Sequence, residues 1–183
     1  MASKNYKSEL DDVFKKFHRF AKASQYRERE KDKISNATRT SINNSVSASS
    51  ASGEKRQELL SDARENADKA AEILLQLHHR LINDFGRFWR QDLITQDQYG
   101  IPEQEIIEAF SILAILSQKP IPTRTITFRM REPDEYGKTR SSLTVSPEPY
   151  VFGLLDCIGE LDRILHDSLK NNQKEFLKQI FKK

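Results

Sequence analysis

The segment LSDARENADKAAEILLQLHHRL, residues 60–81, decides the fold of this chain. Its apolar residues recur at alternating spacings of three and four over three heptads, which places them along one face of an α-helix. These residues are Leu60, Ala63, Ala67, Ala70, Leu74, Leu77 and Leu81. Because alanine occupies several of these positions, a second helix can approach this face closely. The segment therefore predicts a long helix packed against another in a coiled-coil-like manner.

The composition also favours long helices with polar faces. Of the 183 residues, 31% are charged and 37% are apolar, and glycine and proline number only six each. This profile favours long helices over a β-sandwich, and the length predicts one domain or a little more. The net charge of +3 is too small to indicate nucleic-acid binding over the whole surface. Cys157 is the single cysteine and excludes a disulfide framework within the chain. With no signal peptide and no membrane-spanning apolar run, we expect a soluble intracellular protein, cytoplasmic or nuclear.

Upstream of residues 60–81, the sequence predicts another helix that begins near Glu9. Its apolar stripe, at spacings of three and four, is interpreted as core packing. The stripe consists of Leu10, Val13, Phe14, Phe17, Phe20 and Ala21. After Ala23 the chain turns polar, so we expect the helix to continue with most of its sides exposed. The serine-rich residues 45–53 predict its end and a flexible turn.

Downstream, residues 85–89 form an aromatic cluster that suggests core or a subunit interface. Pro102 suits a helix's first turn, and the apolar residues 109–116 must be buried. The alternating pattern between residues 123 and 146 predicts a short β-hairpin, with an ordinary loop as the alternative. Two more helices are expected, one that begins at Ser146 and Pro147 and one over about 173–181.

Two segments far apart in the chain each place two carboxylates on one helical face. They carry Glu105 with Glu108, and Asp156 with Glu160. Both pairs lie in apolar stretches, where an unpaired charge is costly. If the pairs faced each other, they would form a four-oxygen cage for a hard cation, Mg²⁺ or Mn²⁺. Two alternatives are open: surface acids paired with Lys or Arg, and, for the first pair, acids favoured by a helix's first turn.

Basic residues occur in two regions that nucleic acid could contact. In the polar part of the first helix, Arg27, Lys31, Lys33 and Arg39 either line a phosphate-binding surface or belong to a solvated helix face. The residues of the predicted hairpin either touch RNA or are plain surface. They are Arg124, Arg129, Arg131, Lys138 and Arg140.

Several segments, taken in this order, resemble the translin family. They are FHRFAKAS at 17–24, RFWR at 87–90, QEIIEAFS at 104–111, VSPEPYVFGLLDCIGEL at 145–161, HDS at 166–168 and FLKQI at 176–180. Together these segments span most of the chain, from residue 17 to residue 180. No single segment is specific to the family, but their combination is.

The resemblance is closest to the family's Trax-type subunits (translin-associated factor X). It implies an all-α fold, a single domain over residues 1–183 built as a bundle of long antiparallel helices. It also implies a hetero-octamer with translin subunits, which cleaves single-stranded RNA with Mg²⁺. Carried over to this sequence, Glu105, Glu108, Asp156 and Glu160 would be the catalytic and metal-binding acids, and Lys31 and Lys33 would contact RNA. The alternative is a non-catalytic subunit that binds single-stranded RNA or DNA, or a purely structural helical adaptor.

The sequence departs from the family pattern in three places. The stretch between Arg90 and Glu105 is longer than expected by about two helical turns (~3.6 residues each). Lys170 stands where the family favours glycine, and the usual last C-terminal helix is expected to be missing.

Overall fold

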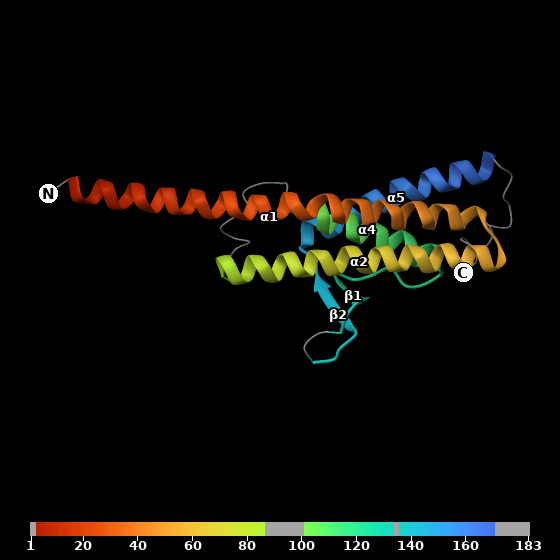
Figure 1. Ribbon diagram of the computed structural model, residues 1–183. Helices are drawn as coiled ribbons and strands as arrows, with labels where there is room; N and C mark the ends of the chain where they lie inside the picture. The colour runs from red at the N-terminus through yellow and green to blue at the C-terminus, as the bar shows by residue number, and fades with distance from the viewer. Residues whose placement is uncertain (1–2, 87–100, 134–135, 171–183) are drawn as a thin grey trace.

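The computed structural model describes residues 3–86, 101–133 and 136–170. Within these ranges the chain forms four helices and a two-stranded sheet (Figure 1). The elements are α1 (Ser3–Ser50), α2 (Gly53–Phe85), α4 (Ile101–Leu116), β1 (Thr125–Arg129), β2 (Arg140–Thr144) and α5 (Pro147–Lys170). The prediction of an all-α fold with one short hairpin is confirmed. No helix in these ranges is both long and apolar enough to cross a membrane.

Helices α1 and α2 pack side by side in opposite directions and form the main pair of helices in the molecule (Figure 1). The predicted seam on α2 is buried as expected, apart from Leu60, which is partly buried at its start. The turn between the helices is shorter than predicted, because α1 continues to Ser50 and only Ala51 and Ser52 separate it from α2. Gly53 has φ +57, a conformation that favours glycine and lets the chain reverse so abruptly.

The second half of α1 is more buried than its polar sequence suggested. Small polar side chains at 38, 41, 45 and 49 lie in the interior. The Ser41 hydroxyl donates a hydrogen bond of 2.8 Å to the backbone oxygen of Ala63 on α2. The small side chains let the two helices approach, and a hydroxyl bound to a helix carbonyl removes the cost of burying it. The expectation that this half of α1 is exposed on most sides is therefore wrong.

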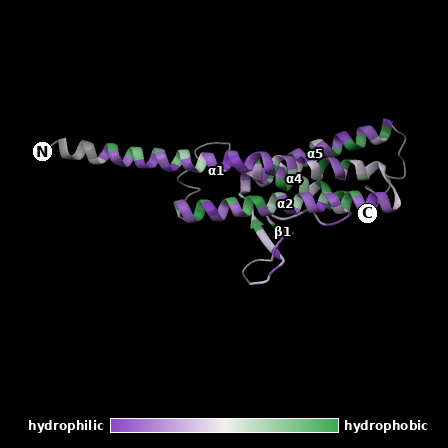
Figure 2. Ribbon diagram, in the orientation of Figure 1, coloured by the Kyte–Doolittle hydropathy of each residue, from purple (hydrophilic) through white to green (hydrophobic). Residues whose placement is uncertain are grey.

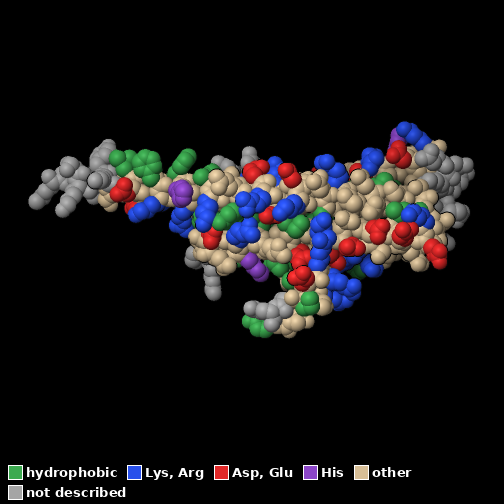
Figure 3. Space-filling view, in the orientation of Figure 1, with side chains coloured by type: hydrophobic (Ala, Val, Ile, Leu, Met, Phe, Trp, Pro, Cys, Tyr) green, Lys and Arg blue, Asp and Glu red, His purple; other side chains and the backbone are tan. Residues whose placement is uncertain are grey.

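The N-terminal part of α1 projects beyond the bundle (Figure 1), and its apolar stripe faces solvent. Phe14 and Phe17 are 68% and 71% exposed, and Leu10 and Val13 are also exposed. Only Phe20 packs against the core. Figure 3 shows apolar side chains gathered on this projecting end, and Figure 2 shows hydrophobic positions recurring along the same part of the α1 ribbon. The prediction that the stripe is core is wrong for the single chain, because none of the other described elements reaches that far.

Helices α4 and α5 pack against each other, and α4 also contacts α1 and α2. As predicted, residues 109–116 of α4 are largely buried. Phe85, at the end of α2, is buried too. The rest of the predicted aromatic cluster, 87–89, and the predicted last helix, 173–181, lie outside the described residues.

The hairpin projects from the bundle on the side of α2 (Figure 1). Its strands pair antiparallel, with Thr125 opposite Thr144 and Arg129 opposite Arg140. Alternate side chains on β1 and β2 point inward, so Ile126, Phe128 and Leu143 join the main core. The other face of the hairpin is exposed and carries hydroxyl and arginine side chains.

Helices α4 and α5 cross at Gly153 with no room for a side chain. A Cβ built at Gly153 would lie 2.5 Å from the backbone oxygen of Gln104 and 2.8 Å from Cβ of Ile107. Gly159, two turns further along α5, has nothing within 4 Å of the same position. Glycine is thus needed at 153 for close packing and is not needed at 159.

We therefore expect Gly153→Ala to destabilise the protein by about 1–3 kcal/mol, because the added methyl would collide with the backbone of α4. Gly159→Ala is the matched control. It should stabilise the chain by about 0.5–1 kcal/mol, because alanine is the better helix former and meets no neighbour. Urea unfolding of both variants measures this difference. Equal stabilities would show that the two helices do not cross at Gly153.

Candidate acidic site

The four predicted acids meet where α4 and α5 pack together beside α1. Glu105 and Glu108 lie on α4, and Asp156 and Glu160 lie on α5. Burial, together with the charges of Asp156, Glu160 and Glu105, raises the pKa of Glu108 to about 7. The structure thus brings the two pairs close enough for the other three carboxylates to act on Glu108.

The Glu105 carboxylate is held by two hydroxyl groups from α1. Ser35 donates to Oε1 at 3.1 Å, and Thr38 donates to Oε2 at 3.2 Å. Hydrogen bonds of this kind fix the direction of a carboxylate without neutralising its charge. Glu105 is therefore oriented by α1, although its own helix is α4.

The two acids of α5 are also engaged. The Gln104 amide donates a hydrogen bond of 2.5 Å to Oδ2 of Asp156, which ties the two helices together. One turn further on, Arg163 forms an ion pair with Glu160 through two of its guanidinium nitrogens, and its Nε lies 3.1 Å from Oε2. The open alternative from sequence, an acid paired with a basic residue, is thus true of Glu160.

Glu108 is different, because no described donor or cation is recorded beside its half-buried carboxylate. Its charge is opposed by burial and by three like charges. The same surroundings raise the pKa of the neighbouring Cys157 thiol to about 12, through burial and then the charges of Glu108 and Glu160. This thiol stays protonated at neutral pH and is not a nucleophile.

The acidic site fits a hard cation by its donor chemistry but not yet by its arrangement. Four carboxylates offer only oxygen ligands, and a bound cation would offset the burial and like charges that oppose ionisation of Glu108. However, no three Asp, Glu, His or Cys side chains of the described residues converge closely enough to hold a metal ion as they stand. Instead, Asp156 accepts a hydrogen bond from Gln104, and Glu160 forms an ion pair with Arg163.

A fifth acid, Glu103, organises the helices around the site. Its carboxylate is 4% exposed and accepts a hydrogen bond of 2.8 Å from the backbone nitrogen of Ser146, just before α5. It also lies 3.5 Å from Nε2 of His78, a buried side chain of α2. His78 is therefore part of the packing between α2 and α4, and Glu103 links α4 to the start of α5.

The predicted nucleic-acid contacts on α1 are not equally accessible. Arg27 is 4% exposed and forms an ion pair with Glu28, so the single chain does not offer it to a strand, and that part of the prediction is wrong. Lys31 is half-buried, Lys33 pairs with Glu30 at 2.8 Å, and Arg39 is exposed. These three stay predictions.

Sequence reasoning missed the residues that hold the acids in place. Gln104 and Arg163 were not predicted as site residues, although each lies within a helical turn of a predicted acid. Gly153 carried a usable signal, since glycine inside an amphipathic helix marks close packing or a functional need. Ser35 and Thr38 carried none, because they approach Glu105 only through tertiary packing.

Comparison with known proteins identifies the family. Residues 15–182 match the family model described as Translin family, which covers nearly the whole chain. The search of curated proteins found no significant match, and neither did the search of solved structures. The matched residues include all four acids of the site, and the fold agrees with the helical bundle that the resemblance implied.

The raised pKa of Glu108 makes stability depend on pH in a defined direction. An acid with a pKa of 4.5 unfolded and about 7 folded binds more protons in the folded state. Its penalty is absent below about pH 4.5, grows as the pH rises, and is complete above about pH 7. After allowance for solvent screening of this half-exposed group, we expect Glu108→Gln to be more stable than wild type by about 1–2 kcal/mol at pH 8.

At about pH 4 the two proteins should be equally stable, because Glu108 is then neutral in both states. Urea unfolding across this pH range measures the difference between them. A constant difference at all pH values would mean that Glu108 is not surrounded by like charges.

Proposed function

Because the chain belongs to the translin family, whose members bind nucleic acids and form oligomers, we propose that it is the Mg²⁺-dependent endoribonuclease subunit of a translin-type assembly. Its substrate is single-stranded RNA. The observation that supports this role is the position of Glu108 among three other carboxylates, Glu105, Asp156 and Glu160, with no described cation beside Glu108 itself. Such a group is costly for stability and is typical of a site that binds a cation.

In this proposal the reaction is hydrolysis of a phosphodiester. Glu105, Glu108, Asp156 and Glu160 would hold Mg²⁺, or Mn²⁺ in its place, and the bound ion would neutralise the phosphate and lower the pKa of water. Glu108 accepts the proton of the attacking water at a carboxylate oxygen, since its carboxylate is not engaged as that of Glu105 is. The bond from phosphorus to the leaving oxygen breaks, and that oxygen takes up a proton.

The chain's own residues also explain how the site could be kept inactive. Arg163 occupies Glu160 and Gln104 occupies Asp156. The hydrogen bond from Gln104 to Asp156 and the ion pair between Arg163 and Glu160 must both break before four carboxylate oxygens can converge on one cation. Ser35 and Thr38 keep Glu105 pointed into the site meanwhile.

The second candidate is a non-catalytic subunit that binds single-stranded RNA or DNA within the same assembly. The ion pair between Arg163 and Glu160, and the lack of three converging ligands among the described residues, favour it. In that case the acids serve only to join α4, α5 and α1.

Cleavage of a labelled single-stranded RNA, in Mg²⁺ and in EDTA, decides between the two. We expect cutting that requires Mg²⁺ and falls by at least about a hundredfold in Glu108→Gln with Asp156→Asn, because both ligands and the base are removed. The matched control is Glu148→Gln with Asp162→Asn, two exposed acids of α5 outside the site. RNA that binds but is not cut by wild type would establish the non-catalytic subunit.

We further propose that translin subunits are the partners of this chain in a hetero-octamer. The projecting end of α1 supports this, since four large apolar side chains lie exposed along one helical stripe. Further apolar residues of α5, among them Phe152 and Ile158, are exposed as well. Contiguous apolar surface of this kind marks protein–protein contacts.

If α1 carries the contact, then Phe14→Ser with Phe17→Ser should reduce the assembled mass of the protein co-expressed with a translin subunit. Each phenylalanine contributes about 1.5–3 kcal/mol when buried. Lys15→Gln with Lys16→Gln, on the same turns, is the control and should leave assembly unchanged. Light scattering after size exclusion gives the mass. A stable, active wild-type monomer would contradict the proposal.

A further inference from the structure

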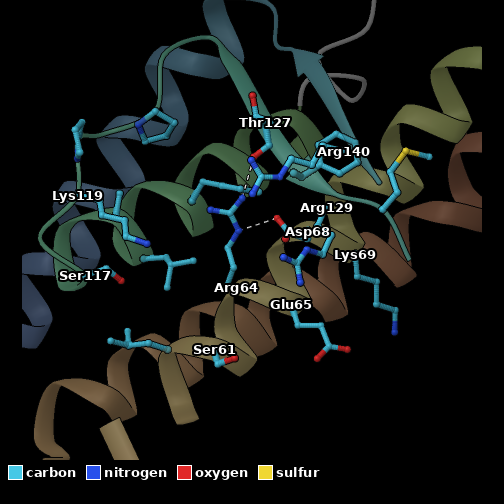
Figure 4. Close-up of a pocket in the computed structure, with 18 of the residues that line it drawn as sticks. Ser61, Arg64, Glu65, Asp68, Lys69, Ser117, Lys119, Thr127, Arg129 and Arg140 are labelled. Carbon is cyan, nitrogen blue, oxygen red and sulfur yellow. Dashed lines mark hydrogen bonds and ion pairs between the residues drawn. The ribbon is translucent and has the colours of Figure 1, made fainter. Parts of the chain in front are cut away.

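A second feature of the molecule is a cleft between α2, the end of α4 and the hairpin (Figure 4). Its volume is about 1060 Å³, at the upper end of the range for ligand sites. It lies on the other side of α4 from the acids, since Phe110 and Leu113 line it whereas Glu105 and Glu108 face α1 and α5. The cleft is thus separate from the acidic site.

The charge of the cleft is strongly positive, in contrast to the chain's small net charge. Six basic residues line it and only two acids, Glu65 and Asp68. The basic residues are Arg64 and Lys69 from α2, Lys119 from the segment after α4, and Arg129, Arg131 and Arg140 from the hairpin. Because the cations come from three elements, they are spread along the cleft and do not converge on one point.

Arg64 is fixed in the middle of this cleft. Its Nε donates to Asp68 at 2.8 Å, and its NH2 donates to the backbone oxygen of Thr127 at 2.9 Å, as the dashed lines in Figure 4 show. Its guanidinium also lies 5.0 Å from the centre of the Phe110 ring. A guanidinium positioned by three contacts loses little conformational freedom when it meets a phosphate.

Asp68 offsets only part of the positive charge of the cleft. Burial raises its pKa, and the charge of Arg64, a backbone hydrogen bond from Arg129 and the charge of Arg129 oppose this rise. One carboxylate thus faces both Arg64 and Arg129, and the six basic residues of the lining still outnumber its two acids. Glu65 is the other acid of the lining and is exposed.

The hairpin register places two of the cations directly opposite each other. Arg129 and Arg140 are partners across the two strands, and both side chains are exposed on the same face. Like charges at opposed positions destabilise an antiparallel pair. No described carboxylate is recorded as an ion-pair partner of either side chain. An anion bound between them would remove this repulsion.

We propose that this cleft binds the phosphodiester backbone of a single-stranded RNA. The inference rests on the proposed function, because it assigns to the same RNA a second contact away from the acids. Spread cations fit a chain of phosphates better than one phosphate, and the aromatic ring of Phe110 is covered by Arg64, so the cleft holds the strand without reading its bases.

The test is binding of labelled oligouridylate by the full chain with its partner, in EDTA so that no cutting is needed. We expect Arg129→Gln with Arg140→Gln to weaken binding about tenfold at low salt. The dependence of log affinity on log salt should become shallower by about 1.4, since each lost phosphate contact accounts for ~0.7. Lys15→Gln with Lys16→Gln carries the same change in net charge outside the cleft and should leave both quantities unchanged.

Thermal unfolding of Arg129→Gln with Arg140→Gln is the control for folding. Loss of the two opposed charges should not lower the stability of this variant. If both double variants weakened RNA binding equally, the proposal that the cleft binds RNA would be wrong. The same holds if neither variant weakened binding while the wild type binds RNA. Either result would leave the proposed function of the acidic site untouched. Displacement of the RNA by inorganic phosphate beyond the effect of chloride at the same ionic strength would overturn the chain-of-phosphates proposal. Loss of Mg²⁺-dependent cutting with binding intact concerns only the acidic site.

Discussion

The crossing of α5 over α4 at Gly153 is the constraint on which the acidic site depends. Only a residue without a side chain lets the backbone of α5 lie against the Gln104 carbonyl. Three residues further along α5, this approach brings Asp156 within 2.5 Å of the Gln104 side chain. The same approach brings Asp156 and Glu160 of α5 near Glu108, which its own helix surrounds only with Glu105. Close packing at one glycine therefore creates the electrostatics of the site.

The repulsion among the acids lowers the stability of the fold, and contacts elsewhere in the helices offset this loss. Glu103 joins α4 to the start of α5 and to His78 of α2, and the α1–α2 seam excludes water over most of its length. A chain held together in this way tolerates one uncompensated acid, Glu108, as functional sites in other folds do. The acidic site and the basic cleft also lie on opposite sides of α4, so their opposite charges are kept apart.

Much of the fold could be predicted from periodicity, and the candidate acids could be predicted as well. Periodicity identifies the apolar and polar faces of a helix, but it does not predict which of these faces another element covers. The stripe around Phe14 is apolar yet exposed, because no other element within the described residues reaches it. Arg27 is charged yet buried, because α1 is covered on that side. The partners of the acids, Gln104 and Arg163, depend on tertiary contacts and side-chain rotamers, which spacing does not encode.

The two-residue connection between α1 and α2 also has a consequence for folding order. These helices pair through contacts that are local in sequence, and such contacts form early because little loop entropy is lost. The acidic site joins segments that are far apart, with Ser35 and Glu105 separated by 70 positions and Gln104 and Asp156 by 52. The repulsion among its carboxylates is therefore incurred late, after the helical hairpin has supplied a surface on which α4 and α5 can dock.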